Sequence, residues 1–123
     1  MSSPWPARTV SASQPRAGEI AGRPVVLDFG DVAAEYAALR SGALLVDQSH
    51  RDRWTITGAR AAEMLTGLVT NDILGLTPGH GHYAAALTPK GKIIADVRLF
   101  ARAADFFVDV PPRAADGWWG MVR

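Results

Sequence analysis

The sequence contains no cysteine among its 123 residues. This absence excludes a disulfide scaffold, a thiolate nucleophile and any zinc or iron–sulfur site that cysteines of this chain would ligate. Long apolar runs are also missing, since none approaches the roughly 20 residues that a helix needs to cross a bilayer. We therefore expect no membrane partner and a cytoplasmic location.

A charge excess of either sign is absent as well. The 13 lysines and arginines nearly balance the 12 acidic residues, which leaves a net charge of +1. A strongly basic surface is the usual mark of nucleic-acid binding, so we expect no nucleic-acid partner. Hydrophobic residues make up 48% of the chain, which is typical of a globular protein with its own core.

Residues 1–20 differ in composition from the rest. They hold Pro4, Pro6 and Pro15 and show neither the helical nor the strand period. We expect a flexible leader over residues 1–20 and a domain over residues 21–123.

Within residues 21–123, apolar patterning predicts alternating strands and helices. Strands are expected at 23–29, 54–58 and 105–110, with a short buried strand at 43–47. Helices are expected at 31–40, which Asp31 can cap, and at 59–69, and Pro111-Pro112 opens a third. The fold class is therefore α+β, a mostly antiparallel sheet with two to three helices.

The most informative segment runs from His82 to Phe100. Two apolar runs flank a Thr-Pro-Lys-Gly-Lys turn, which predicts a β-hairpin. Alternation in the second strand puts Asp96 and Arg98 on one face and the apolar residues on the other. This face either looks at water or lines a pocket, where the Asp96 carboxylate would need a hydrogen-bond partner or act as a base.

Two adjacent tryptophans, Trp118 and Trp119, follow Pro111-Pro112 near the end of the sequence. Such large rings require a surface against which to pack. Either they cover the back of the hairpin, or the chain is the front part of a longer protein. The core predicted here looks small for both rings, which favours the second alternative.

Other candidate residues have simpler interpretations. The run Asp47-Gln48-Ser49-His50 contains the types used in acyl transfer, but a triad is assembled in space, not along the sequence. His50, His80 and His82 lack an acid at ligand spacing, so no metal site is predicted. Asp47 and Asp72 are expected to accept hydrogen bonds from nearby backbone amides.

Several segments together resemble one family, the glycine cleavage T-protein (aminomethyltransferase) superfamily, with its YgfZ-type folate-binding relatives. The resemblance covers about residues 20 to 112. The segments that carry it, in the family's order, are 35–50, Gly58, Thr70-Asn71-Asp72, 79–83 and 90–96.

The resemblance implies tetrahydrofolate as the cofactor and a one-carbon donor as the second substrate. Tyr83 and Asp96 match positions that line the folate site, and Asp96 would be the catalytic carboxylate that orients folate and assists proton transfer. Asn71 and Asp72 would shape the pocket. Val110 would contact the ring system through backbone and apolar groups.

The chain also departs from the family pattern, with Ala95 in place of a first aspartate and Arg51 where methionine is common. Family members are several times longer, so the chain is expected to be an amino-terminal piece. Two alternatives stay open: a non-catalytic YgfZ-type accessory protein for iron–sulfur enzymes, and a domain without ligand. The resemblance implies partner proteins of the glycine cleavage or iron–sulfur systems, and the mitochondrial matrix in a eukaryote.

Overall fold

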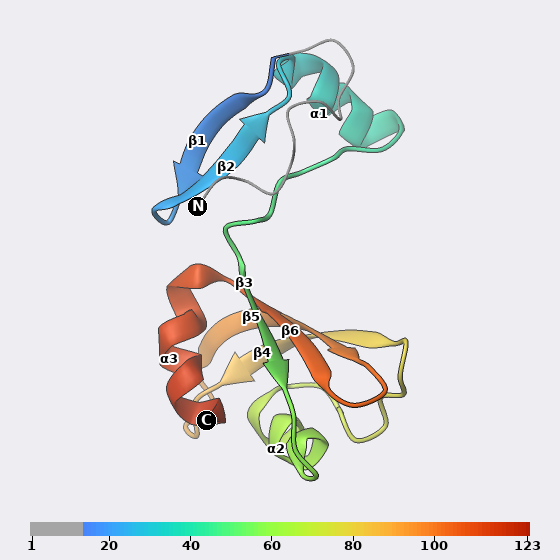
Figure 1. The fold of residues 1–123 in the computed structure, drawn as a ribbon, viewed down its shortest axis with the longest axis vertical. Helices are drawn as coiled ribbons and strands as arrows, with labels where there is room; N and C mark the ends of the chain where they lie inside the picture. The colour runs from blue at the N-terminus through green and yellow to red at the C-terminus, as the bar shows by residue number, and fades with distance from the viewer. Residues whose placement is uncertain (1–13) are drawn as a thin grey trace. The chain divides into compact units, whose positions relative to one another are not determined.

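The computed structural model describes residues 14–123. Residues 1–13, which hold most of the expected leader, lie outside the described part. The chain divides into two compact units, the first ending at His50 and the second beginning at Arg51 (Figure 1). Each unit is considered by itself.

The first unit begins with an antiparallel hairpin of β1 (Arg16–Ile20) and β2 (Arg23–Asp28). The two turn residues, Ala21 and Gly22, have φ values of 52° and 74°, as in the tight turns that join twisted strands. Residues 16–20 therefore form a strand where a flexible leader is expected. The turn signal is weak because alanine rarely adopts positive φ.

Helix α1 (Val32–Ser41) follows, and Asp31 caps it as expected, its carboxylate accepting a hydrogen bond from the Ala34 amide at 2.9 Å. The Glu35 carboxylate accepts another from the Phe29 amide. The apolar face expected from the spacing stays exposed in this unit: Val32, Tyr36 and Leu39 are each 59% or 60% exposed.

The buried strand expected at 43–47 is wrong. No strand forms there, and Leu45 and Val46 are 44% and 54% exposed. Only Asp47 is buried, and its carboxylate accepts hydrogen bonds from the amides of Val26 and Ser49. Because a side chain takes up the Val26 amide, that donor of β2 is not available to a third strand.

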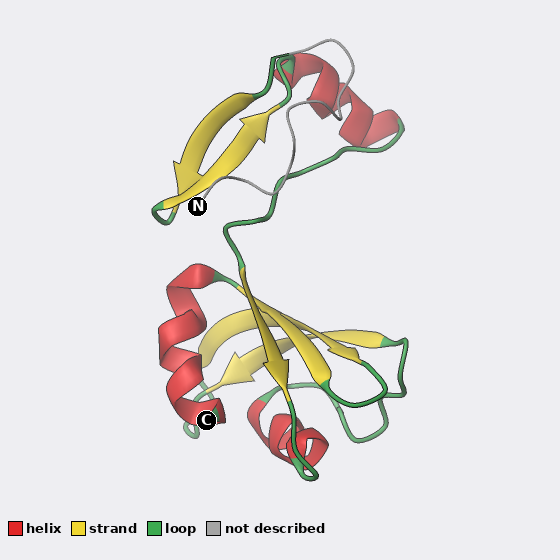
Figure 2. Cartoon of the chain, in the orientation of Figure 1, coloured by secondary structure: helices red, strands yellow, loops and turns green. Residues whose placement is uncertain are grey.

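The second unit is a four-stranded antiparallel sheet with two helices (Figure 2). The strand order is β3-β6-β5-β4, with bounds Asp52–Ile56 for β3, Gly81–Leu87 for β4, Ile93–Ala101 for β5 and Phe106–Val110 for β6. The helices are α2 (Ala61–Leu68) and α3 (Pro112–Val122). The α+β class and the antiparallel hairpin are confirmed.

One face of this sheet packs against both helices and forms the core. Along β5 the buried residues alternate, as the hairpin pattern predicts, with exposed or half-buried ones. The core combines the following buried side chains: Leu65, Val69, Ile73, Ala84, Ala86, Ala95, Val97, Leu99, Val108, Val110, Ala114, Ala115 and Trp118.

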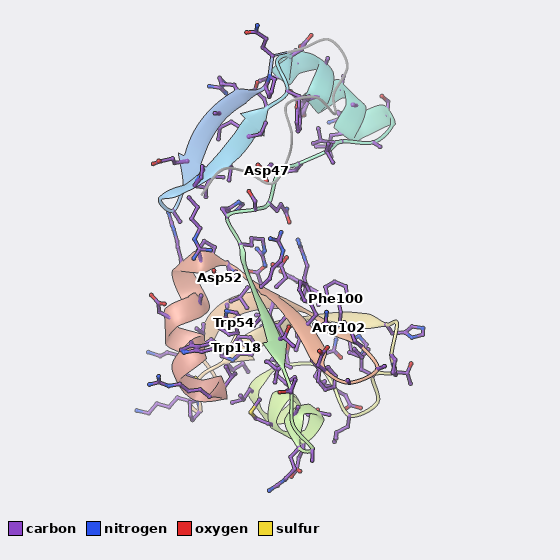
Figure 3. All side chains as sticks on the ribbon, in the orientation of Figure 1. Asp47, Asp52, Trp54, Phe100, Arg102 and Trp118 are labelled. Carbon is purple, nitrogen blue, oxygen red and sulfur yellow. The ribbon has the colours of Figure 1, made fainter. Side chains whose placement is uncertain are left out.

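Trp118 is fully buried, and its ring stacks on Trp54 of β3 with centroids 5.5 Å apart (Figure 3). Trp119 packs edge-on against the same Trp54 ring and stays 48% exposed. The sheet thus supplies, through Trp54, a surface on which both rings of the tryptophan pair pack. The sheet therefore buries Trp118, because β3 contributes an aromatic ring of its own, but it covers Trp119 only in part, so the core does not bury both rings.

No helix among residues 14–123 is long and apolar enough to cross a membrane.

Truncation of Trp118 should be far more destabilising than truncation of its neighbour. Trp118→Ala removes a fully buried ring, and we expect it to lower the free energy of unfolding by about 3–5 kcal/mol. Trp119→Ala is the matched control and should cost less than half as much. Urea denaturation followed by circular dichroism measures both, and equal losses would contradict the burial difference.

Candidate functional site

The site is built on the face of the second unit's sheet that α2 and α3 leave uncovered, called the open face below. Strand register places side chains from all four strands next to one another there. The open face consists of Arg53, Thr55, Tyr83, Ala85, Asp96, Arg98, Phe100, Phe107 and Asp109. Asp96 lies on this face because its neighbours Ala95 and Val97 are buried in the core.

Asp96 is hydrogen-bonded to Tyr83 of β4. The Tyr83 hydroxyl donates to the Asp96 carboxylate at 3.0 Å. Tyr83 lies directly opposite Arg98, so its contact with Asp96 is the diagonal one across the hairpin. Tyr83 is 64% exposed, and Asp96 is half-buried. The two residues that the family resemblance singles out therefore meet on one face of the sheet.

This hydrogen bond also changes the acidity of the phenol. The bond to Asp96 is the main cause that raises the pKa of Tyr83 above its usual value, with desolvation and the Asp96 charge acting in the same direction. The charges of Arg98 and Arg51 oppose the shift. Tyr83 therefore stays protonated, and so remains a donor, to a higher pH than a free tyrosine.

Asn71 is hydrogen-bonded to the backbone of Tyr83. Its side-chain amide donates to the Tyr83 carbonyl at 3.3 Å. Thr70 binds the same strand through its amide, which donates to the Ala85 carbonyl, and through its hydroxyl, which accepts from the Ala85 amide. The Thr70-Asn71 segment thus lies along the free edge of β4 and holds it.

The structure gives two further expected site residues other contacts. Asp72 accepts a hydrogen bond from the Leu74 amide at 3.0 Å, the local backbone role expected for it. Val110 is fully buried and belongs to the core cluster, on the opposite side of the sheet from Asp96. The structure brings Tyr83, Asp96 and the Asn71 segment together, but it does not bring the Val110 side chain to the open face.

A row of charged residues on the open face was missed from the sequence. Arg98 of β5 lies opposite Asp109 of β6, and the Asp109 carboxylate accepts a hydrogen bond from Nε of Arg51. Both side chains of this ion pair are only 11% exposed. The alternation within β5 indicates the face of Arg98, but the partners on β6 and before β3 depend on strand order.

A hollow of about 440 Å³ lies at one end of the open face, lined by Gly81, His82, Tyr83, Arg98 and Phe100. Gly81 is required there, because a Cβ atom would lie 2.7 Å from the Phe100 ring and 2.8 Å from the Leu99 carbonyl oxygen. Phe100 lies beside Phe107, with ring centroids 6.2 Å apart, and Arg102 stands over the Phe107 ring. Aromatic surface is thus present next to the charged row.

The other sequence candidates do not form sites among the described residues. Asp47 uses its carboxylate on backbone amides, and neither Ser49 Oγ nor His50 Nδ1 has a hydrogen-bond partner in residues 14–123, so no hydrogen-bonded triad forms. In the same described range, no group of histidines and acids could hold a metal ion.

This arrangement combines a carboxylate held by a phenol, arginine side chains and exposed aromatic rings on one side of a sheet. A carboxylate in this setting can accept a hydrogen bond from a ligand N–H group, and arginines can bind anionic oxygens. The fold and the site define an α+β domain with a candidate binding surface on an antiparallel sheet.

The family follows from comparison with known proteins. A family model described as the GCVT N-terminal domain matches residues 11–118. The chain is 35% identical over 91 residues to an aminomethyltransferase of Chlorobium chlorochromatii, which covers 73% of this chain and 25% of that protein. It is 34% identical over 101 residues to a probable aminomethyltransferase of Halobacterium salinarum, covering 80% and 28%. The chain belongs to the glycine cleavage T-protein (aminomethyltransferase) family.

A solved structure supports the fold. The crystal structure of glycine cleavage system aminomethyltransferase T from Bartonella henselae matches with a TM-score of 0.66 at 19% identity, over 88% of this chain and 30% of that one. The present chain thus spans between a quarter and a third of the length of these three relatives.

The Tyr83–Asp96 contact predicts a measurable titration. The chain has two tyrosines, so a Tyr36→Phe background leaves Tyr83 as the single phenol. Its titration midpoint should lie above that of a free tyrosine, and Asp96→Asn should move it back toward that value because the carboxylate charge is gone. The ultraviolet absorbance of the phenolate measures both. An unchanged midpoint in Asp96→Asn would show that the contact does not form in solution.

Proposed function

We propose that this chain is the tetrahydrofolate-binding domain of an aminomethyltransferase-like protein that takes part in one-carbon transfer. The observation that carries the proposal is the Tyr83–Asp96 pair on the open face, at the two positions that match the family's folate site. Membership in the family supports it, as do relatives described as aminomethyltransferases. A cytoplasmic location, or the mitochondrial matrix in a eukaryote, is part of the proposal.

The residues of the open face suit this ligand. Asp96 would accept a hydrogen bond from the folate nitrogen that takes up the one-carbon unit, and would assist proton transfer there. Tyr83 holds the Asp96 carboxylate in place through its hydroxyl. Tetrahydrofolate, when bound, supplies the nitrogen that accepts the one-carbon unit. Asn71 fixes the backbone of Tyr83 and so acts as a positioning residue.

The alternative is a non-catalytic, YgfZ-type folate-binding protein that supports iron–sulfur enzymes. The Pro111-Pro112 start of α3 and the tryptophan pair that follows resemble this branch. In that case the same open face would bind folate without turnover. Partner proteins of the glycine cleavage system belong to the first proposal, and iron–sulfur partners belong to the second.

Calorimetric titration with tetrahydrofolate tests the proposal in the full-length protein that contains these residues. One sheet face leaves much of a folate-sized ligand in water, so residues 1–123 alone should bind weakly or not at all. In the full-length protein, Asp96→Ala should weaken binding about tenfold, because it removes a charged hydrogen-bond acceptor.

The matched control is Asp116→Ala on the exposed side of α3, which should bind as the wild type does. Turnover that Asp96→Ala abolishes supports the transferase, and binding without turnover supports the accessory protein. If the wild-type protein binds no tetrahydrofolate, both the transferase and the accessory-protein hypotheses are wrong, and a domain without ligand is favoured.

A further inference from the structure

Arg51 stands where methionine is common in the family, and the structure gives this arginine an unusual environment. Its Nε donates to the Asp109 carboxylate, which places the guanidinium at the edge of the open face. Its Nη2 is buried and has no hydrogen-bond partner within residues 14–123. The ion pair with Asp109 therefore satisfies only part of the guanidinium.

The Arg51 guanidinium thus has a buried N–H donor without a hydrogen-bond acceptor among residues 14–123. The guanidinium stays charged at every accessible pH and carries several N–H donors in a fixed fork. A buried donor without an acceptor is destabilising, and more so on a charged group. Carboxylate and phosphate oxygens match the fork geometry, and their bonds to it are strongest where water is excluded.

The surroundings of Arg51 favour an anionic group as well. Arg53 and Arg98 lie on the same face, directly opposite Asp109 in the two neighbouring strands. With Arg51, three cationic side chains therefore face two carboxylates, those of Asp96 and Asp109. Arg98 lies directly opposite Tyr83 in β4, so this cationic region adjoins the Tyr83–Asp96 pair.

We propose that Arg51, held by Asp109, binds a carboxylate of the ligand whose nitrogen faces Asp96, and so selects ligands that carry an anionic group. The Arg51 side chain is buried except for 11% of its surface. The inference rests on the proposed function, in which the ligand is tetrahydrofolate. Folate carries carboxylates on its glutamate end and none on its pterin and benzoyl rings, so the glutamate carboxylate is the group assigned to Arg51.

The experiment compares two ligands in the full-length protein. Tetrahydrofolate carries the glutamate carboxylates, and tetrahydropteroyl amide has the same rings without them. The wild type should bind tetrahydrofolate about tenfold or more tightly than the amide, as expected for a charge-assisted bond. Arg51→Met should remove this preference by weakening tetrahydrofolate binding while leaving binding of the amide unchanged. Arg51→Lys, which keeps the charge without the fork, should restore part of the preference.

The control is Arg60→Met, the same chemical change at an arginine of the turn before α2 that pairs with Glu63 and is 82% exposed. It should keep the full preference. If Arg51→Met weakens both ligands equally, Arg51 is structural only and the inference falls while folate binding stands. If the wild type binds the amide as tightly as tetrahydrofolate, the inference falls in the same way. If the wild type binds neither ligand, the proposed function fails first and the inference with it.

Discussion

The one-sided burial of strand β5 is the constraint on which the rest of the second unit depends. Ala95, Val97 and Leu99 must lie in the core, and the period of a strand then forces Asp96 and Arg98 to the other side. A shift of register by one residue would place two charges in the core, at a prohibitive cost. The helices α2 and α3 cover only the apolar side and leave the opposite side of the sheet uncovered.

Strand order then decides which side chains lie next to one another on the open face. Because β5 lies between β4 and β6, Arg98 has Tyr83 on one side and Asp109 on the other. Asp109 in turn binds Arg51, which precedes β3 in the chain. Residues separated by up to 58 positions in sequence thus form one row. Thr70 and Asn71 are hydrogen-bonded to the backbone at the edge of β4. They thereby hold the strand that carries Tyr83, the donor to Asp96.

The first unit differs from the second in how little of its helix it buries. Its helix α1 buries no residue, and its hairpin turn places an alanine at positive φ. Residues 43–47, whose apolar pattern predicts a strand, form none, and residues 16–20, which lack such a pattern, form β1. Apolar spacing predicts which residues share a face, but it does not say whether another surface covers that face. In this unit the exposed Tyr36 and Leu39 share such a face and remain uncovered.

The sequence by itself determined the α+β class, the central hairpin and the face on which Asp96 lies, because strand period and turn chemistry are local properties. It also indicated the backbone roles of Asp72 and Asp47. Only the tertiary structure decided that Val110 belongs to the core, that Trp118 finds its partner in Trp54, and that Arg51 joins the row of Asp109 and Arg98. The reason is that pairing between distant strands depends on sheet order, which no local pattern encodes.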